Sequence, residues 1–143
     1  MRKVQKINLE FGEEETMSAI GVSSGYSDYR LAWTLNSVFD WKFEFSPETL
    51  SVPLKKSSTQ YSFHFYQYIS IEDKFELYLL KNKQGGRAIF EDYPQFDFVL
   101  FFRKNMILNL DDILKNLREL DPIIAAYPCS SSDFIASKFL IFD

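Results

Sequence analysis

The sequence has only one cysteine, Cys129, and one histidine, His64. A structural zinc site takes about four Cys or His ligands, so we expect no site of that class, and no cofactor. A single cysteine also excludes a disulfide within the chain, which is usual for proteins of a reducing cytoplasm. Neither residue has a partner in sequence range for a catalytic pair. These absences favour a protein that is not an enzyme, without closing the question.

Long apolar runs and an excess of positive charge are also missing. A run such as FVLFF, residues 98–102, is far below the roughly 20 residues that span a bilayer. Residues 1–11 have no apolar run after their charges, so we expect no secretory signal and a cytoplasmic protein. The net charge is −4, whereas nucleic-acid binders present a basic face to phosphates. We therefore expect neither a nucleic-acid nor a membrane partner.

Aromatic residues, in contrast, are abundant. They make up 17% of the 143 residues, with 15 Phe and 8 Tyr. Aromatic side chains favour strands and are enriched at contact surfaces. A chain of this length is typical of one domain, so we expect a single globular domain over residues 1–143.

Alternation of apolar and polar residues predicts most of the strands. Residues 5–11 and 17–22 are expected to form strands and to pair as a hairpin. Further strands are predicted at 41–45, 59–69, 74–82, 87–91, 96–102, 123–127 and 138–142. Residues 46–58 contain two prolines and predict a surface loop, and residues 128–132 predict another.

Helical spacing predicts two helices. Ser27 or Asp28 can cap the first, which has Leu31, Leu35, Val38 and Phe39 on one side. The second covers 110–120, with Asn109 as its cap. Together the elements predict an α+β fold: a mostly antiparallel sheet, a meander of about five to eight strands, with two helices on one face.

Tyr29 and Trp33 lie one helical turn apart and point away from the apolar stripe of the first helix. Burial under the loop at 46–58 is the commoner outcome for such a pair. If the two are exposed, they form a candidate contact surface, since Tyr and Trp are enriched at binding hot spots. This predicts a non-catalytic domain that binds another protein or a second copy of itself.

A second candidate site is the Gly- and Ser-rich segment at 21–27, which precedes the first helix. Such a loop can hold an anion on backbone N–H groups, and would make the protein a binder of, or an enzyme for, anionic metabolites. The same residues also suit a tight turn and a helix cap, and no phosphate-binding fingerprint accompanies them. The candidate contacts are Gly21, Ser23, Ser24, Gly25 and Arg30.

The stretch FEDYPQFDFVLFFR, residues 90–103, places carboxylates among aromatic residues. Glu91, Asp92 and Asp97 are candidates for acid–base chemistry, with Arg103 as a charge partner. The favoured interpretation is structural: Asp97 accepts backbone N–H bonds and fixes the angle at which the next strand begins. An acidic residue among these aromatics also argues against RNA binding, because it repels phosphate.

Two segments resemble the IPExxxVDY family of small bacterial proteins. Residues 28–43, DYRLAWTLNSVFDWKF, are similar to the helix-and-strand segment of that family. Residues 90–98, FEDYPQFDF, lie where its naming motif falls, and Asp92 and Asp97 occupy its acidic positions. The resemblance implies a bacterial origin and a similar order of elements, and it implies no particular activity.

Overall fold

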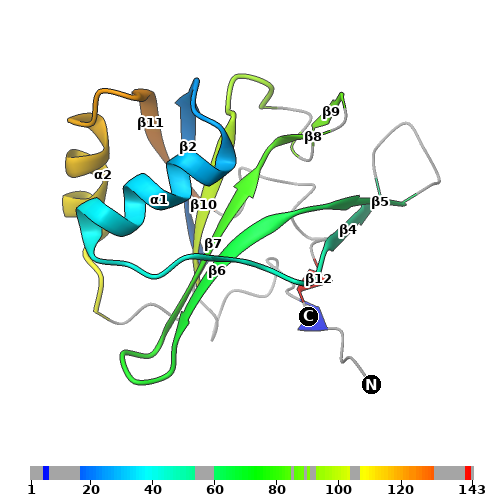
Figure 1. Ribbon diagram of the computed structural model, residues 1–143, viewed down its shortest axis with the longest axis horizontal. Coiled ribbons are helices and arrows are strands. Elements are labelled where there is room, and N and C mark those ends of the chain that lie inside the picture. Colours follow the sequence, from blue (N-terminus) through cyan, green and yellow to red (C-terminus); the bar gives the residue numbers. More distant parts are fainter. Residues whose placement is uncertain are drawn as a thin grey trace.

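The computed structural model describes residues 5–6, 17–53, 60–84, 86–88, 90, 93–103, 107–130 and 141–142. Its centre is a six-stranded antiparallel sheet with two helices, which confirms the predicted α+β class (Figure 1). The strand order is β11-β2-β10-β7-β6-β3. The bounds are β2 (Met17–Ser24), β3 (Glu44–Phe45), β6 (Phe65–Ser70), β7 (Phe75–Lys81), β10 (Phe98–Arg103) and β11 (Ile123–Ser130).

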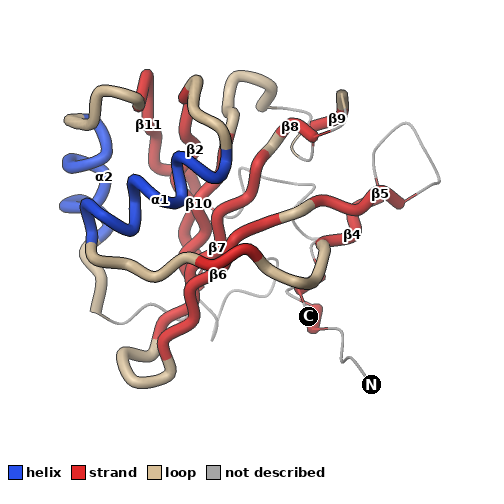
Figure 2. The backbone as a smooth tube through the Cα atoms, viewed as in Figure 1, coloured by secondary structure: helices blue, strands red, loops and turns tan. Residues whose placement is uncertain are grey.

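Three short strand pairs complete the described part of the chain. They join β1 (Gln5–Lys6) to β12 (Ile141–Phe142), β4 (Leu50–Pro53) to β5 (Gln60–Phe63), and β8 (Lys83–Gln84) to β9 (Arg87–Ala88). The β8–β9 hairpin follows β7 in sequence. Figure 2 shows that β4 and β5 extend away from the side of the molecule where the helices lie.

The β10 strand lies inside the sheet, between β2 and β7, and all six of its residues are buried. Phe98, Leu100 and Phe102 face the helices, while Val99 and Phe101 face the opposite side. A strand covered on both faces needs apolar residues at every position, which is why FVLFF does not alternate.

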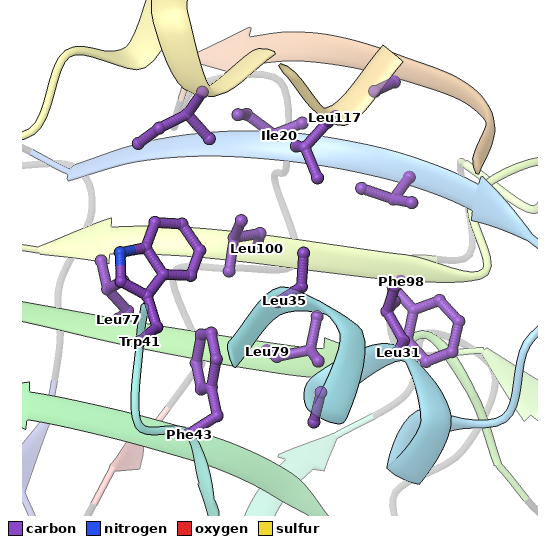
Figure 3. Close-up of a cluster of buried hydrophobic side chains, with 14 of the residues drawn as sticks. Ile20, Leu31, Leu35, Trp41, Phe43, Leu77, Leu79, Phe98, Leu100 and Leu117 are labelled. Carbon is purple, nitrogen blue, oxygen red and sulfur yellow. The ribbon is translucent and has the colours of Figure 1, made fainter. Parts of the chain in front are cut away.

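Helix α1 (Asp28–Phe39) begins at Ser27, whose hydroxyl accepts a hydrogen bond from the Arg30 N–H. Helix α2 (Leu110–Arg118) begins at Asn109, whose side chain accepts from the Asp112 N–H. Both predicted caps are confirmed. Leu31 and Leu35 of α1, and Leu117 of α2, pack on the same face of the sheet with Trp41 and Phe43 (Figure 3).

A second apolar cluster covers the other face of the sheet. Phe90 and Phe96, which precede β10, pack there against Val99 and Phe101. At this point the backbone of β2 approaches closely, because a Cβ on Gly21 would overlap the Phe96 ring. The many aromatic side chains are therefore divided between two apolar clusters, one on each face of the sheet.

The predicted N-terminal hairpin is wrong. Strand β2 has β10 on one side and β11 on the other, so both of its edges are already paired. Residues 5–6 pair instead with residues 141–142. Local alternation identified the strand at 17–22 but carried no information about its neighbours.

Three predicted boundaries also need correction. The loop expected at 46–58 contains β4, which pairs with β5. The loop expected at 128–132 begins within β11, which tolerates Pro128 because it is an edge strand and one side of its backbone needs no partner. The strand expected at 41–45 is regular only at Glu44–Phe45, while Trp41 and Phe43 enter the core from an irregular segment.

Candidate functional site

The outer face of α1 carries two large exposed aromatic side chains. Tyr29 is 68% exposed and Trp33 is 63% exposed, whereas Leu31 and Leu35 on the opposite side are buried at 1% each. The burial expected for the aromatic pair is therefore wrong. Residues 50–53, part of the segment expected to cover the pair, are instead strand β4, paired with β5.

A surface hollow of about 250 Å³ lies at this face, lined by Tyr26, Tyr29, Arg30, Trp33 and Thr34. We call it the α1 hollow. Tyr29 and Trp33 are neighbours on the helix surface because residues four apart lie one turn above one another. The structure thus places Arg30, which the sequence assigned to the anion site, beside the aromatic pair assigned to the contact surface.

Arg30 lines the α1 hollow and contacts the Tyr26 ring there. Its guanidinium carbon lies 4.2 Å from the centroid of the Tyr26 ring, which is a cation–π contact. The Asp28 carboxylate, two residues earlier in α1, accepts a 2.8 Å hydrogen bond from the Tyr29 N–H. Among the described residues Arg30 forms no ion pair. The hollow therefore presents one positive charge between aromatic walls.

Further aromatic side chains connect α1 with the edge strand β3. Burial raises the pKa of the Tyr66 phenol, and the negative charge of Asp28 and the Tyr29 phenol, both in the first turn of α1, raise it further. The Tyr66 ring contacts the Phe45 ring edge-on, with the two ring centroids 5.2 Å apart, and the centroids of the Phe45 and His64 rings are 5.3 Å apart. Phe45 is 52% exposed, so exposed aromatic surface occurs both on α1 and at β3.

The Gly- and Ser-rich segment has a different structure from the expected loop. Strand β2 continues to Ser24, so Gly21, Ser23 and Ser24 lie in the sheet and only 25–27 separate it from α1. The Ser23 hydroxyl donates to the Gln95 carbonyl at 2.7 Å, and the Ser24 hydroxyl donates to the Pro122 carbonyl at 2.7 Å. Of the five predicted anion contacts, Gly25 and Arg30 are exposed.

Asp97 binds the end of this same strand. Its Oδ2 accepts a 2.9 Å hydrogen bond from the Ser24 N–H, and its Oδ1 lies 3.7 Å from the Lys83 ammonium. Asp97 thus accepts a backbone N–H bond where β10 begins, as the structural interpretation predicted, although the donor belongs to β2 rather than to the preceding loop. Glu91 and Asp92 lie outside the described residues.

Arg103, at the other end of β10, pairs with Glu76 rather than with Asp97. The Arg103 Nη1 lies 2.7 Å from Glu76 Oε1, which also accepts a 2.7 Å hydrogen bond from the Tyr78 hydroxyl. Burial first, and then the hydrogen bond to Glu76 and its charge, raise the pKa of the Tyr78 phenol. This group of three joins β7 to β10 and is mostly buried, which fits a structural role.

Asn82 is a buried polar residue that the sequence patterns did not single out. It is 0% exposed, accepts from the Phe90 N–H at 2.8 Å, and donates to the Tyr93 and Phe96 carbonyls at 3.1 and 2.8 Å. Its side chain therefore holds the segment before β10 against the sheet. The available signal was an Asn as the last residue of the strand predicted at 74–82, but an amide at a strand end is too common to be diagnostic.

Within the described residues, no group of three His, Cys, Asp or Glu side chains is placed to hold a metal ion. No helix there is long and apolar enough to cross a membrane. Comparisons with protein-family models, curated proteins and solved structures found no match for this chain. The resemblance to the IPExxxVDY family and the cytoplasmic location therefore stay predictions.

Proposed function

We propose that this chain is a non-catalytic interaction domain that binds another protein, or a second copy of itself, through the outer face of α1. The observation that carries the proposal is the pair Tyr29 and Trp33, 68% and 63% exposed on a helix whose other side is anchored in the core. A rigid helix presents these rings in a fixed geometry, so little conformational entropy is lost when a partner covers them.

The energetics favour a contact role for this pair. Tyr and Trp each bury roughly 150–250 Å² when covered, and they dominate the residues whose loss weakens interfaces most. Isolated exposed apolar residues are normal on proteins, but here two aromatics and an arginine, the three residue types most enriched at hot spots, adjoin one hollow.

The polar groups that the sequence offered for chemistry support the same proposal. Asp97 is hydrogen-bonded to Ser24, and Arg103 is paired with Glu76, at opposite ends of β10. Each group joins neighbouring strands, and neither is placed beside the α1 hollow. We therefore assign these residues to the scaffold and the exposed face of α1 to function.

The test is a pull-down from lysate of the native host with the wild-type chain and a Tyr29→Ala/Trp33→Ala variant. Circular dichroism and thermal melting establish first that the variant is folded, as exposed residues should allow. Sedimentation of both proteins over a range of concentrations covers self-association. A partner or dimer formed only by the wild type supports the proposal, and identical behaviour of the two folded proteins contradicts it.

The alternative is a small anionic ligand, and the observation that favours it is the Arg30 guanidinium in the α1 hollow. It predicts that a phosphorylated or carboxylated metabolite raises the melting temperature of the wild type and not of Arg30→Ala. A metabolite screen that shifts neither protein removes this alternative.

A further inference from the structure

We propose that the partner of the α1 hollow is an acidic peptide segment: its carboxylate pairs with Arg30 while an adjacent apolar side chain packs on Tyr29 and Trp33. This inference rests on the proposed function and adds the chemistry of the partner. It concerns a separate protein, and a second copy of this chain is one of the outcomes that the test distinguishes.

The free hydrogen-bond donors of Arg30 are the first argument. Its guanidinium carbon lies 4.2 Å from the centroid of the Tyr26 ring, which is a cation–π contact. No described residue accepts a hydrogen bond from the guanidinium, so its planar set of N–H donors is available to a partner. Carboxylates match the planar donor fork of arginine and bind it through two parallel hydrogen bonds.

Charge complementarity is the second argument. Arg30 forms no ion pair with any described residue, and the Asp28 carboxylate accepts a hydrogen bond from the Tyr29 N–H within the first turn of the helix. Covering Arg30 with an apolar partner would leave a desolvated, unpaired charge, which is strongly unfavourable. A partner that buries Tyr29 and Trp33 must therefore bring a negative group to Arg30.

The small hollow and the exposed rings beside it favour a peptide over a free metabolite. Small-molecule sites enclose roughly 300–1,000 Å³ and bury most of their ligand. The α1 hollow has about 250 Å³ and lies on the surface, so it accommodates one or two side chains of a larger partner. The remaining contact area comes from the exposed rings of Tyr29 and Trp33, which line the hollow together with Arg30.

A random dodecapeptide display library, selected on the immobilised full chain, tests this inference. Parallel selections use Trp33→Ala, Arg30→Gln and, as a charge-matched control, Lys115→Gln on the exposed surface of α2. We expect peptides with a Glu or Asp next to an apolar or aromatic residue to be enriched on the wild type and on Lys115→Gln. They should be lost on both Trp33→Ala and Arg30→Gln.

A synthetic copy of the enriched peptide then gives the size of the effect. Exchanging its Glu for Gln should weaken binding by about tenfold or more, because a charge-assisted bidentate pair is lost. Arg30→Lys should restore only part of the affinity, since a lysine keeps the charge without the planar fork. Emission from the exposed Trp33 provides the titration signal.

The other outcomes separate the inference from the proposed function. The enriched peptides could lack an acidic residue and depend on Trp33 but not on Arg30. That result would overturn the acidic partner and would still support the contact surface. Enriched peptides that match an acidic stretch of this chain would assign the occupant to a second copy and overturn a separate partner. No Trp33-dependent enrichment would overturn this inference and count against the contact surface as well.

Discussion

The Ser24 backbone N–H donates a 2.9 Å hydrogen bond to the Asp97 carboxylate, which joins two segments 73 positions apart in sequence. One segment is the Gly- and Ser-rich end of β2, where an anion site was considered, and the other is the acidic stretch before β10, where acid–base chemistry was considered. The anion that this segment holds is therefore the chain's own carboxylate. Both features belong to the junction of two neighbouring strands.

Replacing Asp97 with alanine is expected to lower the free energy of unfolding by about 1–3 kcal/mol, because the Ser24 N–H loses a charged acceptor in a half-buried position. Asp97→Asn keeps a carbonyl acceptor and should recover most of that loss. Lys83→Ala removes only the exposed 3.7 Å pair and should change stability by less than about 1 kcal/mol. Denaturant unfolding measures all three, and equal losses for Asp97→Ala and Lys83→Ala would contradict the assignment.

Gly21→Ala is expected to destabilise the protein by about 1–3 kcal/mol, since the added Cβ would overlap the buried Phe96 ring. In the Phe96→Leu background the same change should cost less, because the flat ring that it meets is gone. Gly25→Ala is the matched control: its Cβ would meet nothing within 4 Å, so stability should hold or rise slightly. An equal effect of Gly21→Ala with and without Phe96 would exclude the clash as its cause.

Glu76→Ala is expected to lower the free energy of unfolding by on the order of 3 kcal/mol, because it removes a carboxylate that pairs with a buried arginine at 2.7 Å. The double variant Glu76→Ala/Arg103→Ala should be less destabilised than the sum of its single variants. The wild type, the two single variants and the double variant form a double-mutant cycle, and chemical denaturation measures the stability of each. Additive losses would show that the 2.7 Å pair contributes no coupling energy.

The raised pKa of the Tyr78 phenol predicts a loss of stability in alkali. The native state favours the protonated phenol of Tyr78. The stability that this preference contributes is complete below the unfolded pKa of about 10, and it is lost as the pH rises above that value toward the folded pKa. Tyr78→Phe removes the phenol and with it this dependence of stability on pH. The gap in unfolding free energy between wild type and variant should narrow between pH 9 and pH 11, and a gap that is independent of pH would contradict the prediction.

The elements that the sequence predicted well are those with a strong local pattern. Helix α2 was predicted at 110–120 with Asn109 as its cap; it is found at Leu110–Arg118 with that cap, and with isoleucine and leucine side chains buried on one side. The β10 strand was predicted at 96–102, where the run FVLFF is apolar without interruption. In each case the signal lies within about ten consecutive residues and needs no knowledge of neighbours.

The features that were missed depend on contacts between distant segments. No local sequence pattern predicts that β2 pairs with β10 and β11, or that Asn82 binds the segment that begins at Phe90. The exposure of Trp33 was not predictable either, because helical spacing separates two faces without saying whether a loop covers the second. The candidate site could thus be named from sequence, but whether it is accessible follows from the tertiary structure.

The central claim, that the outer face of α1 is a contact surface, is tested most directly by photo-crosslinking from position 33 in cells of the native host. A photoreactive phenylalanine analogue replaces Trp33, and a second protein carries it at Lys115 on the exposed surface of α2. The proposed function predicts a discrete adduct from position 33 that is weakened by Tyr29→Ala and absent from position 115. Equal labelling from both positions, or none from either, would contradict it.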